Sequence, residues 1–366
     1  MRIKILLFFN VLMPPILFSQ NYLGSPHLMR SPTGLILGDA YTARATDDFT
    51  LFYNPATMGR NKTVSVNALN MYGSLTDPLG NSEKFENMPS SPNGVANRLL
   101  NFPIHAQVGS VPNIKFVNFA FSLLFNVDIN AIVTNRAHPV LDLNYRYDNG
   151  FIFGAGFPLS KDSCGGTTMG ASAKYIKRTG IDDRFPLVGT RILNAIKDDA
   201  KFADVLRDLG ATTDKTWGFD LGFEYSCAKG PMEVSTGISA LDIYTKFKAP
   251  EGKTLPEQPM TVNWGMSWKF QLPLVHLALS ADLSPLNRAL PYNQIYHLGA
   301  EVGTPLFSLL AGSTSAGLSY GASVNIFVAK LIGGFYHTNV GDPENPINEK
   351  RAMIYLSLLD FSFDGL

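Results

Sequence analysis

The chain has 366 residues, with 30 basic and 30 acidic side chains and therefore a formal net charge of zero. Charged residues make up 16% of the chain, against about 25% of a typical soluble domain. Because phosphate binding requires a basic face, this balance argues against nucleic acid as a partner. The length fits two soluble domains of about 150 residues each, or one large β-barrel.

The N-terminus has the layout of a secretory signal peptide. A short basic head, "MRIK", precedes the apolar run "ILLFFNVLMPPILFSQ", which ends in small or polar residues. A transmembrane anchor is the alternative, but Pro14 and Pro15 interrupt the run, and it is shorter than the about 20 residues that a spanning helix needs. We therefore predict that residues 1–20 direct export and are removed after Ser19 or Gln20.

Residues 21–61 lie between this leader and the first strand pattern, so they must lie outside or inside the structure that the later strands form. They are too apolar for a free tail, and Gly34, Gly38 and Asn54-Pro55 favour bends. We predict a compact hatch inside that structure; an arm resting beneath it is the alternative. The residues expected to pack against the wall or a ligand are Phe49, Leu51, Phe52, Tyr53, Asn54, Pro55 and Ala56.

From about residue 62 onward the hydrophobic period is two. In "TWGFDLGFEYS", Trp217, Phe219 and Leu221 alternate with Gly218 and Asp220. Successive side chains of a strand point to opposite faces, so each such segment has one apolar and one polar face. The same alternation occurs in residues 141–147, 168–176, 232–240, 260–270, 275–283, 295–303 and 318–326.

A soluble β-sandwich also alternates, but three features favour a barrel in a membrane. The runs reach about 10 to 12 residues, as a tilted strand needs to cross lipid, whereas globular strands average about 5 to 6. Aromatic residues lie near the strand ends, as in interfacial girdles, and the polar faces combine glycine with isolated charges. We predict that residues 62–366 form a transmembrane antiparallel β-barrel of about 14 strands, and at most about 16, because residues 113–135 fit either one bent hairpin or a strand and a loop.

The connections are of two lengths. Short ones are expected at 148–150, 160–166, 227–231 and 271–273, and long ones at 74–102, 179–215, 244–258 and 339–349. Counting strands alternately up and down from a first strand at 62–72 places the long ones at one end, which we take as extracellular. In 179–215 the spacing turns helical, with Gly210 as the expected C-terminal stop; the predicted loop helix either covers the barrel mouth or forms part of an apolar entry groove. Its stripe comprises Ile192, Ile196, Ala203 and Leu206.

Cys164 and Cys227 are the two cysteines of the chain. An even count in an exported protein suggests a disulfide. Both lie in short connections that the strand count puts at the same end of neighbouring hairpins. We predict a structural bridge between them, provided that their Cα atoms come within about 7 Å.

The sequence gives little support for a metal site, a cofactor or catalysis. The six histidines form no H-x-x-x-H or Cys/His cluster. The one G-x-S-x-G match, Gly317 to Gly321, falls in an alternating segment and not at a turn between a strand and a helix, so we predict a protein that is not an enzyme. The charged positions on the polar faces mix both signs. Such a set predicts a lattice of ion pairs inside the wall, since a selectivity ring more often shows one sign. They are Asp142, Arg146, Lys174, Asp220, Glu224, Lys269, Asp282 and Glu301.

Three motifs in residues 31–69 carry a family resemblance: Gly38-Asp39-Ala40-Tyr41, Asp47-Asp48 and Asn54-Pro55-Ala56. The segment resembles the N-terminal region of the long-chain fatty acid outer-membrane transporters, the FadL/TodX family. The resemblance implies a barrel of about 14 strands that an N-terminal hatch plugs. It also implies that hydrophobic ligands are captured at the outer loops, pass to a lumen pocket and leave sideways through a gap in the wall as the hatch shifts. A related branch with the same motifs serves protein secretion.

These expectations lead to a passive outer-membrane channel for hydrophobic small molecules, with fatty acids as the favoured class. Its partners would be that ligand and the outer-membrane lipid, with no cofactor. The alternative is a barrel that binds a secreted protein in secretion or surface attachment. A hydrophilic porin is disfavoured by the apolar hatch.

Overall fold

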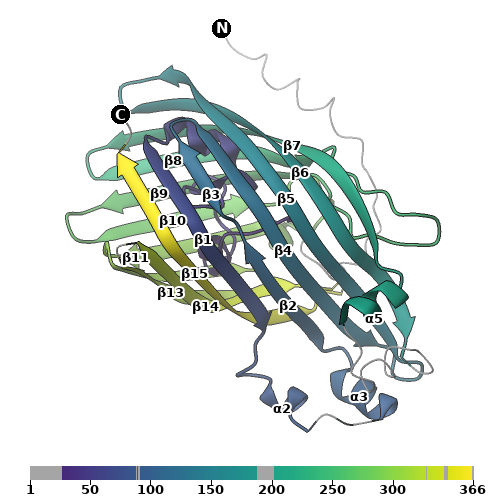
Figure 1. The fold of residues 1–366 in the computed structure, drawn as a ribbon. Helices are drawn as coiled ribbons and strands as arrows, with labels where there is room; N and C mark the ends of the chain where they lie inside the picture. The colour runs from purple at the N-terminus through teal and green to yellow at the C-terminus, as the bar shows by residue number, and fades with distance from the viewer. Residues whose placement is uncertain are drawn as a thin grey trace.

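A computed structural model describes residues 27–364 except 88, 90, 188–201, 327 and 342–344. The predicted signal peptide and the start of the predicted hatch lie outside the described residues. The described strands form one antiparallel sheet that closes on itself (Figure 1), because β1 pairs with β15 over Thr63–Thr76.

The sheet follows the order of the chain, and each strand pairs with the next except that β2 and β3 do not pair with each other. Within the described residues, 15 named strands fill 14 positions around the barrel, because β2 and β3 share the place between β1 and β4. The predicted strand number is thereby confirmed. The strands are β1 (Thr63–Thr76), β2 (Pro103–Ser110), β3 (Asn113–Phe116), β4 (Phe119–Thr134), β5 (Val140–Lys161), β6 (Gly165–Pro186), β7 (Thr212–Lys229), β8 (Met232–Ile243), β9 (Thr261–Gln271), β10 (His276–Leu283), β11 (Tyr296–Gly303), β12 (Phe307–Thr314), β13 (Gly317–Ile326), β14 (Ala329–Asn339) and β15 (Asn348–Asp364).

The alternating pattern places its apolar side chains on the outside of the barrel. Trp217 is 51% exposed, whereas Asp220, on the opposite face of β7, is fully buried. Trp264 also faces outward and is exposed; packed between two sheets of a sandwich it would be buried. Aromatic rings stack along the outer surface, as Phe119 does with Phe153 at 6.1 Å. An outer wall of this kind is suited to contact with acyl chains.

One predicted connection is wrong. Asp148, Asn149 and Gly150 lie in the middle of β5, and the chain turns instead at residues 135–139. The tripeptide favours a turn in isolation, but here the ladder between β5 and β6 continues through it. The Asp148 carboxylate accepts two hydrogen bonds from Arg178 of β6, which stabilise the extended conformation.

The ambiguous segment 113–135 is a hairpin. β3 pairs with β4, and the chain reverses at residues 117–118, where Asn118 has a φ of +67°. Asparagine tolerates this left-handed conformation better than most residues.

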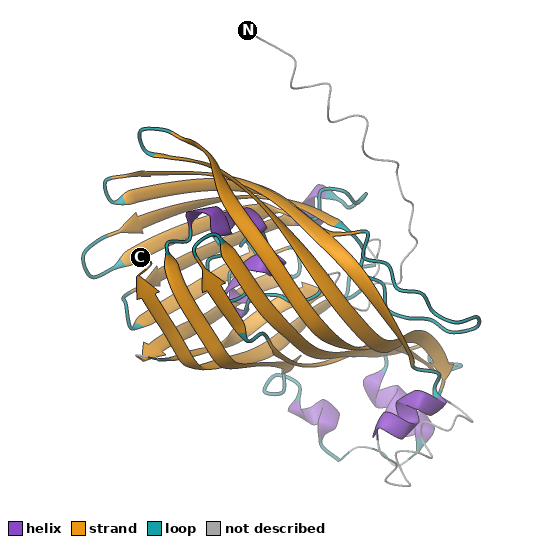
Figure 2. Cartoon of the chain, turned by 45° about the horizontal axis from the view of Figure 1, so that its top comes forward, coloured by secondary structure: helices purple, strands orange, loops and turns teal. Residues whose placement is uncertain are grey.

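The four predicted long connections lie at one end of the barrel, together with the short turns at 135–139 and 315–316, and the remaining short turns lie at the other end (Figure 2). The long-loop end carries the helices α2 (Ser82–Phe85), α3 (Pro92–Leu99), α5 (Phe202–Asp208) and α6 (Tyr292–Ile295). No helix among the described residues is long and apolar enough to span a membrane.

The described part of the predicted loop helix is α5, which contains Ala203 and Leu206; Ile192 and Ile196 lie outside the described residues. Leu206 packs with Leu143 and Ile181. Leu143 and Ile181 are odd-numbered, like the outward-facing side chains of β5 and β6, so they lie on the outer face of these strands. The helix therefore covers the outer flank of the strands where they extend past the apolar wall.

Candidate functional site

Residues 27–61, called the hatch segment below, lie inside the barrel (Figure 2). They contain the helix α1 (Pro32–Ile36) and two 3-10 helices, η1 (Thr50–Phe52) and η2 (Pro55–Arg60). α1 packs against β12 to β15, and η2 packs against β5, β6 and β7. The segment thus touches opposite sides of the wall and fills the space between them.

Local capping explains where its helices begin. Ser31 accepts a hydrogen bond from the Gly34 N–H at 3.3 Å, and Pro32 occupies the first turn of α1. Asn54 does the same for η2, since its Oδ1 accepts the Ala56 N–H at 3.0 Å and Pro55 follows it. The Asn-Pro-Ala motif therefore starts a short helix.

All seven hatch residues proposed from the sequence are buried. The Phe49 ring lies 5.9 Å from that of Tyr355 in β15. The Tyr53 hydroxyl donates to Asp39 at 2.7 Å and accepts the Ser31 N–H at 3.1 Å, which ties the two halves of the hatch segment together. These aromatic side chains pack within the hatch segment and against the wall.

Glycines in the wall make room for η2. A Cβ on Gly170 would lie 2.4 Å from the Pro55 carbonyl carbon, and one on Gly222 would lie 1.9 Å from Asn54 Oδ1. Atoms cannot approach this closely, so side chains at these positions would displace the motif. We call these residues, together with Gly156 and Gly237, the glycine cradle; they come from the four neighbouring strands β5 to β8.

From Asp39 to Arg44 the hatch segment is held mainly by polar side chains of the wall, whereas the backbone of Gly38 lies directly against Gly312. Asp282 of β10 accepts the backbone N–H groups of Tyr41 at 2.9 Å and Thr42 at 2.7 Å. In β11, His297 Nδ1 donates to the Gly38 carbonyl at 2.7 Å, and Glu301 forms an ion pair with Arg44.

The predicted lattice of charges inside the wall is present, and most of its members are paired. Lys174 lies between Asp220 at 2.8 Å and Asp242 at 2.6 Å. The other pairs are Arg146–Asp128, Arg184–Asp142, Arg60–Glu224, Arg44–Glu301 and the backbone bonds to Asp282. Lys269 has no ion pair among the described residues; it is exposed and lines a cavity.

Arg178 is a luminal residue that sequence reasoning missed. Its side chain is fully buried and binds Asp148 through two nitrogens at 2.6 and 2.8 Å. It also donates to the Pro256 carbonyl at 2.7 Å and lies 4.4 Å from the Phe247 ring. These contacts fasten the connection between β8 and β9 across the long-loop end. The sequence could have indicated this role, because Arg178 falls on the polar face of its strand. The turn wrongly predicted at 148–150 removed its partner Asp148 from the neighbouring strand.

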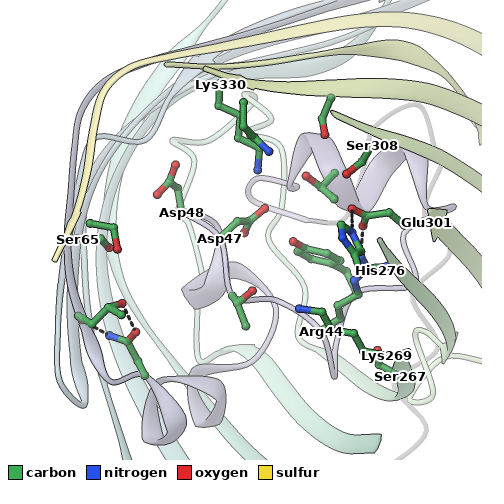
Figure 3. Close-up of a pocket in the computed structure, with 18 of the residues that line it drawn as sticks. Arg44, Asp47, Asp48, Ser65, Ser267, Lys269, His276, Glu301, Ser308 and Lys330 are labelled. Carbon is green, nitrogen blue, oxygen red and sulfur yellow. Dashed lines mark hydrogen bonds and ion pairs between the residues drawn. The ribbon is translucent and has the colours of Figure 1, made fainter. Parts of the chain in front are cut away.

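Two cavities lie on either side of the hatch segment. The larger, of about 510 Å³, opens at the short-turn end, and Asp47 and Asp48 of the hatch segment project into it (Figure 3). Its wall is polar and includes Ser267, Lys269, His276, Glu301, Ser308 and Lys330. The smaller, of about 130 Å³, lies toward the long-loop end beside Asp39 and His297. Neither is lined by Phe49, Leu51, Phe52 or Tyr53, and only the larger has a mainly polar lining.

The wall has a break between β2 and β3. β2 ends at Ser110 and β3 begins at Asn113, so the middle of β1 lacks a regular partner on this side. The Asn70 side chain takes its place: its Oδ1 accepts the Val111 N–H at 2.6 Å, and its Nδ2 donates to the Val111 carbonyl at 2.8 Å. Val111 is buried in one apolar cluster with Leu28 and Met29 of the hatch segment. Nothing in the local sequence pattern indicated this role of Asn70.

Cys164 and Cys227 are joined by a disulfide at the short-turn end, with their Cα atoms 4.8 Å apart. The adjoining turn is organised by Asp162, which accepts the N–H groups of Cys164 at 2.9 Å and Gly165 at 2.7 Å, and the hydroxyl of Tyr225 at 2.9 Å. These hydrogen bonds, that of Cys164 first, lower the pKa of the Asp162 carboxyl. No cluster of three His, Cys, Asp or Glu side chains suited to a metal ion occurs among the described residues.

No protein-family model matches the sequence, and no curated protein matches it. Among solved structures, the toluene transporter TbuX of Ralstonia pickettii aligns with 10% identity over 91% of this chain and 98% of its own, with a TM-score of 0.45. The toluene transporter TodX of Pseudomonas putida aligns with 10% identity over 92% and 98%, with a TM-score of 0.43. A FadL homologue of Pseudomonas aeruginosa aligns with 10% identity over 94% and 100%, with a TM-score of 0.39.

Proposed function

We propose that this chain is an outer-membrane channel that passes hydrophobic small molecules, with long-chain fatty acids as the favoured ligands and the hatch segment as its gate. The apolar outer wall supports a place in a bilayer, since exposing it to water would be costly. The lumen supports a gated channel, because the hatch segment lies between the polar cavity at the short-turn end and the smaller cavity toward the long-loop end.

The break between β2 and β3 is the observation that carries the proposal. It places the apolar cluster of Val111, Leu28 and Met29 directly behind a gap in the backbone ladder. A hydrophobic ligand that displaces this cluster would reach the membrane without crossing the polar cavity at the short-turn end. A hydrophilic solute would gain nothing from such an exit.

The gate in this arrangement combines the hatch segment with Asn70. Because the Asn70 amide replaces ladder hydrogen bonds, it closes the break with two bonds of about 1 kcal/mol each. The Ser110 hydroxyl adds a third bond, which it donates to the Asn70 carbonyl at 2.6 Å. Breaking these three bonds costs far less than separating two strands that are paired along their length. An acyl chain gains about 25 cal/mol for each Å² removed from water, so its burial would offset the opening.

The test measures binding of a fluorescent fatty acid to the purified barrel in detergent. We expect saturable binding to the intact protein, and altered binding when residues 21–61 are deleted. In a second experiment, Asn70→Ala should speed transfer of the fluorescent fatty acid into vesicles that contain the protein. The matched control is Asn263→Ala, which removes another buried asparagine, in β9 on the other side of the barrel. Absence of saturable binding to the intact, correctly folded barrel would overturn the proposal. Copurification of a secreted protein would favour the secretion alternative instead.

A further inference from the structure

Two lysines face each other across neighbouring strands on the outside of the barrel. Lys177 of β6 and Lys215 of β7 are direct partners in the ladder, and both side chains are exposed. Like charges directly opposite each other destabilise a sheet. Neither lysine has an ion pair or a side-chain hydrogen bond with any residue that the structure describes. We call Lys177 and Lys215 the lysine patch.

The lysine patch lies next to a cluster of aromatic rings. Two residues along the same face toward the short-turn end, Tyr175 pairs with Trp217, and their ring centroids are 5.3 Å apart. Phe151 of β5 packs against both rings, at 5.7 and 5.9 Å. Such a cluster is typical of the height at which acyl chains give way to head groups. Because strands rise about 3.3 Å per residue, the lysines lie about 7 Å beyond it.

Toward the long-loop end the outer face becomes polar. The Thr179 and Thr213 hydroxyls, 2.8 Å apart, form the next pair of the ladder on this face. One hydroxyl hydrogen of the pair remains free to donate to a ligand. The apolar rings, the ammonium groups and the hydroxyls therefore follow one another along two adjacent strands, which lie side by side in Figure 1.

The carboxylate nearest in sequence does not neutralise the patch. Asp214 belongs to the inner face of β7, where it is the ladder partner of Arg178, and its Oδ2 accepts the Lys248 N–H at 2.6 Å. Lys246 and Lys248, on the connection after β8, are also exposed.

We propose that the lysine patch binds the phosphate of an anionic lipid head group in the leaflet on the long-loop side. This rests on the membrane location proposed above. A phosphate between the two ammonium groups would convert their repulsion into two attractive contacts, with a hydroxyl of Thr179 or Thr213 as a further donor. The acyl chains of the same lipid would lie along Phe151, Tyr175 and Trp217. Basic positions at a membrane surface recognise anionic lipids in this way.

The test compares lipid retention in nanodiscs made of phosphatidylcholine and phosphatidylglycerol. We expect the wild-type barrel to enrich phosphatidylglycerol, as measured by native mass spectrometry. Lys177→Gln together with Lys215→Gln should weaken this enrichment roughly tenfold or more. Lys161→Gln with Lys229→Gln removes the same charge from exposed positions at the short-turn end and should leave it unchanged. Equal enrichment by the wild type and the Lys177/Lys215 variant would overturn the proposal.

Thermal unfolding gives a second, independent readout. In phosphatidylcholine alone, the Lys177/Lys215 variant should be at least as stable as the wild type, because the repulsion is gone. Adding phosphatidylglycerol should raise the melting temperature of the wild type and not that of the variant. An equal rise in both would contradict specific binding. Failure of the barrel to enter nanodiscs would count against the membrane location itself, and loss of fatty acid binding would count only against transport.

Discussion

The two sides of the hatch segment are held in the barrel in different ways. η2 lies in the glycine cradle, where its backbone is in direct contact with the backbone of the wall. The backbone of Gly38 also lies against the wall, beside Gly312. Residues 39–44 instead depend on the Asp282 carboxylate, which accepts two backbone N–H groups, and on the ion pair of Arg44 with Glu301. The contact of η2 with the wall therefore depends on shape, whereas that of residues 39–44 depends on polar groups that water can replace.

This difference indicates where movement of the hatch segment would begin. A close fit of backbone against backbone tolerates no small displacement, because any shift produces a clash or a void. Hydrogen bonds at the edge of a wet cavity contribute about 1 kcal/mol each and can be exchanged for bonds to water. Residues 39–44 should therefore loosen first, while η2 remains in place as the anchor. Arg44 and Arg60 line the cavity at the short-turn end, so trypsin can report on the two regions separately.

The largest effect is expected from filling the glycine cradle. Gly170→Ala places a methyl group 2.4 Å from the backbone of Pro55, which cannot move without the rest of η2. Overpacking of this kind costs about 1–3 kcal/mol or more. We expect η2 to leave the wall, so that trypsin cleaves after both Arg44 and Arg60 and the conductance of the barrel in planar bilayers rises.

Gly73→Ala is the matched control, since the nearest atom to its added Cβ is 3.7 Å away. It should leave both cleavage sites protected. If Gly170→Ala kept Arg60 as resistant to trypsin as in the wild type, the glycine cradle would not be the anchor.

A smaller, more local effect is expected from Asp282→Asn. The substitution keeps the size of the side chain but removes the charge that strengthens its hydrogen bonds from Tyr41 and Thr42. The free energy needed to detach residues 39–44 from the wall should fall by about 1–3 kcal/mol. Trypsin should then cleave faster after Arg44 and at an unchanged rate after Arg60.

Asp142→Asn serves as its control. Asp142 is also a luminal carboxylate, but it pairs with Arg184 of the neighbouring strand. Equal acceleration at Arg44 and Arg60 in the Asp282 variant would show that the hatch segment moves as one body, and the contrast between its two sides would be lost.

The sequence predicted the wall better than the contents of the lumen. Alternation in segments such as 216–226 determines which face meets lipid, and it needs no knowledge of the partner strand. The number and direction of the strands followed from the same pattern. The turn assigned to 148–150 failed because Asp148 is stabilised by Arg178, a contact that appears only once β5 and β6 are aligned.

The contents of the lumen depend on distances that no local pattern encodes. The sequence shows that the polar faces contain glycines but not why. The position of η2 in the structure explains why Gly170 and Gly222 cannot carry a side chain. In the sequence, Asn70 is one more polar residue of an alternating strand. Its role becomes apparent only in the structure, where the strand position next to β1 is interrupted between β2 and β3. The aromatic hatch residues are buried, but the side chains that line the two cavities are others.

The smallest effect is expected from removing the disulfide. Cys164 and Cys227 lie at the ends of β6 and β7, which also carry Gly170 and Gly222 of the glycine cradle. A disulfide typically contributes about 2–4 kcal/mol by restricting the unfolded chain, and here β6 and β7 are already paired along their length. Replacing both cysteines by serine should therefore lower the melting temperature of the barrel slightly and leave trypsin cleavage after Arg44 and Arg60 as in the wild type. Reduction of the native protein should have the same effect, and it should change nothing in the double variant. A close fit between backbones should not depend on one covalent bond at the short-turn end. Faster cleavage after Arg60 in either case would therefore mean that the disulfide, and not the fit in the glycine cradle, holds η2 in place.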